Sequence, residues 1–458
     1  MFSNIRNIHF VGIGGIGMSG IAEILINQGF HVSGSDNAIT EVTEHLASLG
    51  AIVQQGHDRK NVQHADVLVY SSAVSLDNPE VQEAVERGIP VIRRAEMLAE
   101  VMRLNYGIGV AGTHGKTTTT SLIGLVLIEA ELDPTVIVGG KLHGLGGTNA
   151  RLGKGKFTVV EADEFDRSFL QLSPTIAVMT TLEEEHLDIY SDLDDIKGAF
   201  IEFANKVPFY GFVVLCLDEP ALQEIRPLIK KKTVSYGLTS QSDVHAIDLV
   251  HKERMTEFTV MYKQQEIGRM TLQLPGEHNV KNALAAIAVG LEINIPFETM
   301  KRALEKFTGV FRRFEIKGEY QGIMIVDDYA HHPTEVKETL RGIKAGWRRR
   351  VVTVFQPHTY TRTRDFYDQF GRSFFNTDIL LVTDVYPARE QPIQGVSGAM
   401  IVDAAKRYGH KDARYIPLTT DVPKTLMDIA QPGDIILTMG AGDIYKYGNE
   451  FVKQLKKR

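Results

Sequence analysis

The sequence predicts an α/β protein with three domains. Short apolar strands alternate with helical segments in three successive series along the 458 residues, a pattern typical of parallel sheets covered by helices. Two glycine-rich turns, one in the first series and one in the second, each follow a strand and open a helix. A chain of this length is too long to fold around a single hydrophobic core, so several domains are expected. We place them at 1–103, 104–310 and 311–458.

The first series predicts a parallel sheet in the N-terminal domain. Its strands are the apolar segments IHFVGIG, HVSGSD, ADVLVYSSA and PVIRR. Helices are expected between them over 18–28, 41–49 and 78–86.

The second and third series predict two more sheets. Strands of the second are YGIGVAG, TVIVGG, FTVVEAD, TIAVMTT and FVVLCL, and those of the third are GIMIVDDY, VVTVFQP, DILLVTDVY and DIILTMGAG. Between them, residues 233–275 contain period-two stretches such as FTVMYK, which indicate a small antiparallel sheet added to the middle domain. Third-series strands end in polar or glycine residues, where open α/β sheets bind ligands.

Composition excludes several classes of function. The net charge of −7 argues against a broad nucleic-acid surface. No apolar run approaches the ~18 residues of a membrane helix, and the N-terminus lacks the apolar core of a signal peptide. Cys216 is the single cysteine, so no internal disulfide forms. We therefore expect a cytoplasmic protein without nucleic-acid or membrane partners.

Residues 109–120, GVAGTHGKTTTT, predict a phosphate-binding loop. Loop N–H groups and the positive end of the following helix hold phosphate oxygens, while Lys116 reaches the terminal phosphates and Thr117 holds Mg²⁺. The loop is shorter than the standard motif, because Val110 stands where that motif has a glycine. An ordinary glycine turn with a helix cap is the alternative. The residues expected around the phosphates are Gly112, Thr113, His114, Gly115, Lys116, Thr117 and Thr118.

A second glycine loop, Gly12–Gly17, has the G-x-G-x-x-G spacing and is followed by Asp36 at the end of the next strand. By itself this pattern suggests a dinucleotide fold with the acid on a ribose. The loop requires only a diphosphate, however, which a UDP-sugar also supplies, and a tight turn without a ligand stays open. NAD beside ATP is an unusual pair, whereas a nucleotide-activated substrate beside ATP is a natural one.

Acidic clusters follow two middle-domain strands. Glu161–Asp166 and Glu183–Asp188, which includes His186, favour Mg²⁺ binding because hard cations take oxygen ligands. Solvated acidic loops and a structural histidine are the alternatives. Further on, Asn279 and Asn282 share a helical face and suit an adenine edge, although Asn279 is equally placed to cap that helix.

The third domain has two polar clusters. Residues 327–335 and 355–364 each end a strand, and we expect them at adjacent strand ends, where they form a ligand-binding edge. Arg362 in the second cluster and Arg313 at the domain junction suit carboxylate or phosphate binding, although a single arginine is more often a surface charge.

Together these motifs resemble the Mur ligases, ATP-dependent enzymes that build the peptide of peptidoglycan. The matching segments are GIGGIGMSGIAE, SGSD, AGTHGKTTTT, EADE, EEEHLDIY, GEHNVKNALAA, FRRFE, DDYAHHPTEV and FQPHTYTRTRD. The resemblance implies a Rossmann-like N-terminal domain for a UDP substrate, a P-loop central domain for ATP, and a Rossmann-like C-terminal domain for an amino acid. The first segment and the last three resemble members that join L-alanine to UDP-N-acetylmuramate through an acyl phosphate and a tetrahedral intermediate. A recycling ligase that adds a murein tripeptide is the closest alternative. The protein is expected to be a monomer or a homodimer.

The resemblance also implies residue roles. Lys116 stabilises the transferring phosphoryl group, Thr117 and Glu161 hold one Mg²⁺, and His186 holds a second. Contacts to ATP are expected from Asn279, Asn282, Arg313 and Asp328. The UDP-sugar site is expected to contain Gly14, Gly15, Ser35, Asp36, His57, Ser71 and Arg93, and the amino-acid pocket His331, His358 and Arg362.

Three positions depart from the family pattern. Thr359 stands where many members carry arginine, Phe165 replaces a serine, and Glu185 replaces an aspartate. The first departure affects a contact to the incoming amino acid or substrate.

Two other classes of function explain fewer of these motifs. The hypothesis of an NAD-dependent oxidoreductase, based on the first glycine loop, does not explain Lys116, Glu161 and His186. A nucleotide-gated binding protein that only hydrolyses ATP does not need the third-domain motifs.

Overall fold

The structure is a computed structural model that describes residues 5–71, 73–103, 105–139, 149–185 and 189–457. The described residues form three sheets, which confirms the predicted α/β class. It divides into two compact units, and the predicted domain boundaries stay a prediction. The first unit contains residues 1–247, 259–270 and 281–307, and the second contains 248–258, 271–280 and 308–458.

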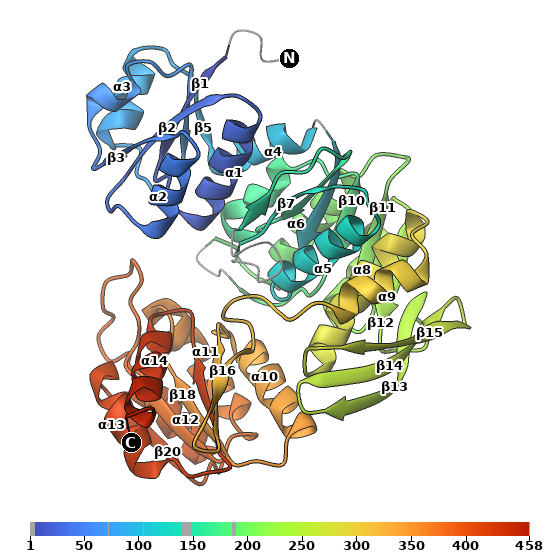
Figure 1. Cartoon of the computed structure of the whole chain (residues 1–458), viewed down its shortest axis with the longest axis vertical. Helices are drawn as coiled ribbons and strands as arrows, with labels where there is room; N and C mark the ends of the chain where they lie inside the picture. The colour runs from blue at the N-terminus through green and yellow to red at the C-terminus, as the bar shows by residue number, and fades with distance from the viewer. Residues whose placement is uncertain (1–4, 72, 104, 140–148, 186–188, 458) are drawn as a thin grey trace. The chain divides into compact units, whose positions relative to one another are not determined.

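The N-terminal sheet has five parallel strands in the order β3-β2-β1-β4-β5. The predicted strands and helices are present, and β3 is an additional strand. Strands are β1 (Asn7–Val11), β2 (His31–Asp36), β3 (Ile52–Gln55), β4 (Val67–Tyr70) and β5 (Val91–Arg93); helices are α1 (Ile16–Asn27), α2 (Glu41–Ser48), α3 (Pro79–Glu86) and α4 (Arg94–Arg103). The glycine loop thus follows the central strand of this sheet (Figure 1, blue).

The middle sheet has ten strands in the order β15-β14-β13-β12-β11-β10-β6-β9-β7-β8. Strands β10, β6 and β9 are parallel neighbours, so their carboxyl ends meet at one edge. The strands are β6 (Tyr106–Ala111), β7 (Thr135–Ile137), β8 (Ala150–Arg151), β9 (Phe157–Glu161), β10 (Ile176–Met179), β11 (Phe212–Cys216), β12 (Thr233–Gly237), β13 (Val244–Lys252), β14 (Met255–Tyr262) and β15 (Gln265–Leu272). The helices are α5 (Lys116–Glu129), α6 (Leu193–Asn205), α7 (Pro220–Ile225), α8 (Glu277–Glu292) and α9 (Phe297–Glu305).

The antiparallel expectation for 233–275 is correct only in part. Strands β13, β14 and β15 are joined by two-residue turns, which only antiparallel neighbours allow. Strand β12, however, runs parallel to both β11 and β13. The α7 segment between β11 and β12 explains the first of these two pairings, since a helical crossover returns the chain in the same direction.

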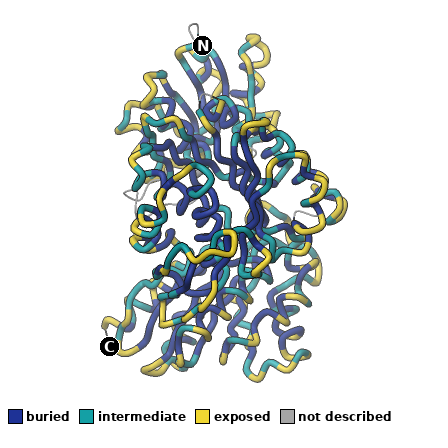
Figure 2. Tube along the Cα trace, turned by 90° about the vertical axis from the view of Figure 1, so that its right-hand side faces the viewer, coloured by how far each residue is buried: buried dark blue, intermediate teal, exposed yellow. Residues whose placement is uncertain are grey.

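The C-terminal sheet has six strands in the order β16-β17-β21-β18-β19-β20, with β16 antiparallel at the edge. Apolar side chains cover both of its faces, and the four inner strands are buried (Figure 2, dark blue), whereas the two edge strands are mostly half-buried. The strands are β16 (Glu315–Tyr320), β17 (Ile323–Asp328), β18 (Val351–Phe355), β19 (Ile379–Thr383), β20 (Ala413–Ile416) and β21 (Ile435–Met439). The helices are α10 (Pro333–Gly346), α11 (Tyr360–Ser373), α12 (Ala399–Arg407), α13 (Val422–Ile429) and α14 (Ile444–Leu455).

The expectation that the two C-terminal polar clusters lie at adjacent strand ends is wrong. They follow β17 and β18, and β21 pairs with both of these strands and lies between them. The last strand of the chain inserts into the middle of the sheet, a long-range pairing that local sequence patterns do not reveal.

Within the described residues, no helix is long and apolar enough to cross a membrane. The thiol of Cys216 is buried in β11, in line with a structural role.

Candidate active site

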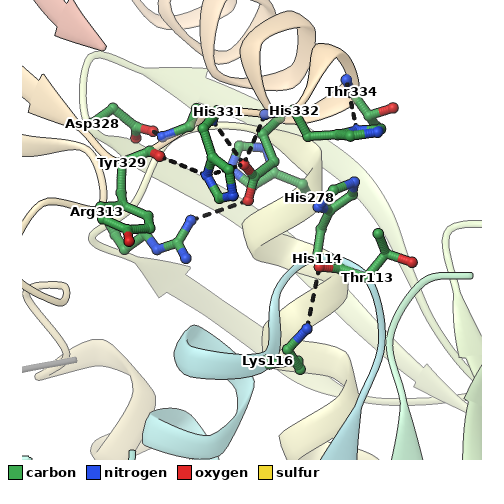
Figure 3. Close-up of polar contacts among 12 residues, drawn as sticks. Thr113, His114, Lys116, His278, Arg313, Asp328, Tyr329, His331, His332 and Thr334 are labelled. Carbon is green, nitrogen blue, oxygen red and sulfur yellow. Dashed lines mark hydrogen bonds and ion pairs between the residues drawn. The ribbon is translucent and has the colours of Figure 1, made fainter. Parts of the chain in front are cut away.

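The phosphate-type loop connects β6 to α5, and two of its residues must be glycine. Gly112 has φ of +142°, and a Cβ there would lie 2.0 Å from the hydroxyl oxygen of Thr180. Gly115 has φ of +83° and precedes the first residue of α5, Lys116 (Figure 3). Glycine is therefore required both for backbone conformation and for the close approach to β10.

The end of β10 holds this loop in shape. The N–H of His114 donates to the hydroxyl of Thr181 at 2.7 Å, and the N–H of Thr113 donates to the carbonyl of Thr181 at 3.2 Å. The hydroxyl of Thr180 donates to the carbonyl of His114 at 2.5 Å. The start of α5, where Lys116 and Thr117 are half-buried, is consequently fixed as a helix N-terminus suited to an anion.

Lys116 forms a buried ion pair with Glu164. Its ammonium group lies 2.8 and 2.7 Å from the two carboxylate oxygens and donates to the carbonyl of Gly112 at 2.6 Å. Burial alone lowers the pKa of Lys116, but the carboxylates of Glu164, Asp163 and Glu185 raise it above its ordinary value. The lysine is thus held protonated. Burial raises the pKa of Glu164 to about 7, against the lowering effect of Lys116.

Glu161 lies at the edge expected for a magnesium ligand. It ends β9 opposite Val110, one residue from the end of β6, and its carboxylate accepts the N–H of Gly139 at 2.7 Å. The register brings this carboxylate to the same edge of the sheet as the glycine loop, which leads directly to Thr117 at the start of α5. Hydroxyl and carboxylate oxygens are the donors that Mg²⁺ prefers. The predicted ligand His186 lies outside the described residues.

Both predicted asparagines lie in α8 and are buried. The amide of Asn279 donates to the carbonyl of Pro275 at 2.8 Å. Helix α8 begins at Glu277, so Asn279 is inside the first turn and is not its N-cap. The carbonyl of the Asn282 amide accepts from Thr119 at 3.2 Å.

The predicted UDP-sugar residues are distributed along the carboxyl edge of the N-terminal sheet. The structure brings Gly14 and Asp36 together, since the N–H of Gly14 donates to this carboxylate at 2.9 Å. Ser35 lies 2.9 Å from Nδ1 of His57. The N–H of Ser71 donates to β1, and Arg93 is exposed at the end of β5. Gly15 is exposed at the N-cap of α1.

The DDYAHH segment is folded tightly after β17. Asp328 is buried and accepts the N–H groups of Phe314 and Ala330 at 2.8 and 2.7 Å. Burial raises its pKa to about 6, opposed by Arg313 and these hydrogen bonds. Arg313 forms an ion pair with Glu335 at 3.2 Å (Figure 3). This arrangement fixes the two residues predicted to contact ATP relative to each other.

The three residues predicted for the amino-acid pocket lie together despite the intervening strand. The rings of His331 and His358 are 5.9 Å apart, and a guanidinium nitrogen of Arg362 lies 3.4 Å from Nδ1 of His358. Burial, and secondly Arg362, lower the pKa of His358 to about 4, so the ring is neutral near pH 7. The ring also stacks on Tyr386, which the sequence did not single out.

Thr359 has an unusual backbone. Its φ of 64° and ψ of 145° are strained for a β-branched residue. The strain is held by hydrogen bonds from Thr359 N–H to the carbonyl of Tyr386 at 2.9 Å and from Tyr386 N–H to the carbonyl of Pro357 at 2.8 Å. The position where the sequence departs from the family pattern is therefore also a strained one.

Comparison with known proteins identifies the family. Family models described as "Mur ligase family, catalytic domain", "Mur ligase middle domain" and "Mur ligase, glutamate ligase domain" match residues 7–106, 110–290 and 312–442. The chain is 54% identical over 456 residues to a UDP-N-acetylmuramate–L-alanine ligase from Geotalea uraniireducens, covering 100% of this chain and 99% of that protein. The chain belongs to the Mur ligase family.

Solved Mur ligase structures have the same fold. A UDP-N-acetylmuramate-alanine ligase from Thermotoga maritima superimposes with a TM-score of 0.84 at 29% identity, covering 99% of this chain and 100% of that one. A murein peptide ligase from Psychrobacter arcticus, at 24% identity, gives a TM-score of 0.71 and covers 99% of both chains. The three-domain Mur ligase architecture expected from the sequence is thereby confirmed.

Sequence reasoning missed two acidic residues that the structure places beside predicted site residues. Glu164 was part of the EADE motif but received no task, and Glu80 was not considered. A buried carboxylate close to a predicted ligand-binding residue is recognised only from the tertiary contacts. The NPE sequence at 78–80 shows a helix start and nothing about burial.

Proposed function

We propose that this Mur ligase joins L-alanine to the carboxylate of UDP-N-acetylmuramate, with ATP converted to ADP and phosphate. The observation that carries the proposal is the full-length similarity, at 54% identity, to a ligase named for this reaction, in a chain that keeps the Lys116 loop.

The chemistry explains why a phosphate loop and an amine-binding domain occur in one chain. A carboxylate does not condense with an amine in water, so its oxygen first takes the γ-phosphoryl group of ATP and releases ADP. The neutral amine then attacks the acyl phosphate, and the tetrahedral intermediate expels phosphate. The protein contributes positioning and charge neutralisation.

The family resemblance assigns the residue roles in this chemistry. Lys116 neutralises the phosphoryl group during transfer, with the loop 112–118 around the phosphates. Asn279, Asn282, Arg313 and Asp328 contact ATP. The UDP-sugar lies at the N-terminal glycine loop, and His331, His358 and Arg362 border the alanine pocket.

Magnesium would be held by Thr117 and Glu161, whose oxygens fit a hard cation, and would supply charge neutralisation at the phosphates. The second ion proposed for His186 rests on the family resemblance.

The test is release of phosphate from ATP in the presence of UDP-N-acetylmuramate, with L-alanine, with murein tripeptide, or with neither. Release that depends on L-alanine, together with the ligated product by mass spectrometry, supports the proposal. Release only with tripeptide identifies the recycling ligase, and release without either amine identifies a plain ATPase; both outcomes refute it.

A further inference from the structure

A buried carboxylate lies under the glycine-loop edge of the N-terminal sheet. Glu80, in the first turn of α3, has a relative exposure of 0%. It accepts hydrogen bonds from the hydroxyl of Ser35, the side-chain amide of Asn61 and, at 3.2 Å, the N–H of Asp58. Through these hydrogen bonds the single acid of α3 is connected to β2 and to the segment after β3.

Two histidines also approach this carboxylate. Nε2 of His9 lies 3.5 Å and Nδ1 of His57 lies 3.4 Å from the same oxygen of Glu80. Burial by itself raises the pKa of Glu80, but the nearby His9 ring and hydrogen bonds from Ser35 and Asn61 outweigh it and lower the pKa to about 2. At neutral pH Glu80 is thus an anion that can only accept hydrogen bonds.

The direction of the hydrogen bonds determines the tautomer of His57. The hydroxyl of Ser35 has one proton, which it gives to Glu80. Nδ1 of His57, 2.9 Å from that hydroxyl oxygen, must then be the donor. A neutral ring with its proton on Nδ1 has Nε2 as an acceptor. The His57 side chain keeps 18% of its surface exposed, so the ring is accessible to a ligand.

The same segment supports the glycine loop. The carbonyl of Ser35 accepts the N–H groups of Gly12 and Ile13 at 2.8 and 3.0 Å. The carboxylate of Asp36, which in Rossmann-type folds contacts a ribose hydroxyl, is engaged by the N–H of Gly14. His57 follows the adjacent strand β3, at the same carboxyl edge. Its Nε2 is a hydrogen-bond acceptor in addition to the carboxylate of Asp36, one oxygen of which already accepts the N–H of Gly14.

We propose that Glu80 is a positioning residue for the UDP substrate: through Ser35 it orients His57 so that Nε2 accepts a hydrogen bond from a ribose hydroxyl. The proposal deepens the proposed function and rests on it, because the ribose belongs to the UDP-sugar. Glu80 itself touches no reacting atom, so its loss affects substrate binding and leaves the phosphoryl-transfer step intact.

The test compares Glu80→Gln with Glu83→Gln, a matched change one turn later in α3, where the carboxylate pairs with Arg59 and Arg87 instead. Calorimetry gives the Kd of UDP-N-acetylmuramate, and steady-state kinetics give KM and kcat. For Glu80→Gln we expect Kd and KM for this substrate to rise by about 10- to 100-fold. The KM for ATP and kcat should change less than about twofold, as should every parameter of Glu83→Gln.

Action through His57 is tested by a double-mutant cycle and by substrate analogues. Glu80→Gln combined with His57→Ala should bind no more weakly than His57→Ala alone. The 2′-deoxy or the 3′-deoxy analogue should bind the wild type more weakly than the parent substrate, and this discrimination should disappear in His57→Ala. Nitrogen-15 spectra of the His57 ring should show a protonated Nδ1 that Glu80→Gln perturbs. Ser35→Ala, which keeps the buried acid, should reproduce the binding loss if Glu80→Gln proves unstable.

Several results would overturn the inference. One is that Glu80→Gln and Ser35→Ala both bind UDP-N-acetylmuramate as tightly as the wild type. Another is that the effects of Glu80→Gln and His57→Ala add in the double-mutant cycle. A third is that the wild type binds both deoxy analogues as tightly as the parent substrate. Failure of the wild type to bind UDP-N-acetylmuramate at all is a different result, which refutes the proposed function together with this inference.

Discussion

Replacing Lys116 by alanine should have two separable consequences, one for turnover and one for stability. Turnover falls because the charge on the transferring phosphoryl group is no longer neutralised, and we expect kcat to drop by at least about 10²- to 10³-fold. Stability falls because Glu164, with a side chain 4% exposed, loses the ammonium group 2.7 Å away and must either stay charged without a partner or take up a proton. The two effects originate in the same atom but respond differently to a second mutation.

The loss of stability follows from the geometry of the pair. At an effective dielectric constant of about 20, unit charges 2.7 Å apart attract by about 6 kcal/mol. Desolvation of both groups offsets part of this attraction, and removing one partner of a buried pair costs about 3–5 kcal/mol. Adding Glu164→Gln removes the orphaned charge. The double variant should therefore regain much of the lost stability while its turnover stays as low as that of Lys116→Ala.

The stability difference depends on pH in a definite direction. The pKa of Glu164 is raised by burial from 4.5 to about 7, so its ionisation destabilises the folded state as pH rises from 4.5 through 7. Without Lys116 the pKa of Glu164 rises further. The deficit of Lys116→Ala should thus be small near pH 5 and grow as pH rises above 7.

Urea unfolding followed by circular dichroism, with hydrogen exchange of the peptides that contain β6 and α5, measures these differences. Three results would refute the reasoning: near-normal turnover of Lys116→Ala, a double variant as unstable as the single one, or a deficit that is equal at pH 5 and pH 8. The first would also remove the phosphate-loop assignment.

Three further predictions concern the metal, the loop and the N-terminal domain. Glu161→Gln should raise the Mg²⁺ concentration for half-maximal activity at least about tenfold, and an unchanged magnesium titration would exclude it as a ligand. Gly112→Ala should lower the free energy of unfolding by more than about 1–3 kcal/mol, because φ is positive at this position and the added methyl meets Thr180. Gly198→Ala is the control, since no atom lies within 4 Å of the added methyl there. Equal melting temperatures of the two variants would contradict this prediction. Because the pKa of Glu80 falls from 4.5 to about 2, its ionisation contributes about 3 kcal/mol above pH 4.5 that is lost as pH falls towards 2. The urea stability of wild type and Glu80→Gln should converge over that range, and a constant difference would contradict the linkage.

Local patterns in the sequence determined the α/β class, most strands and the position of both glycine loops. Strand and helix alternation is read from neighbouring residues, and a glycine with a forced positive φ, such as Gly115, is visible from its place between a strand and a lysine. The order of the motifs along the chain was sufficient to indicate the Mur ligase family, and thereby the residues expected to bind ATP and the UDP-sugar.

The tertiary structure decided what those residues contact. Lys116 and Glu164 are 48 positions apart, and Ser35 and Glu80 are 45 apart, so each pair depends on the order of strands in a sheet. The insertion of β21 between β17 and β18 is a third example. Sequence motifs report which side chains are present near a strand end. Burial and counter-ions, which set the charge of Glu164 and the tautomer of His57, arise only when distant segments pack together.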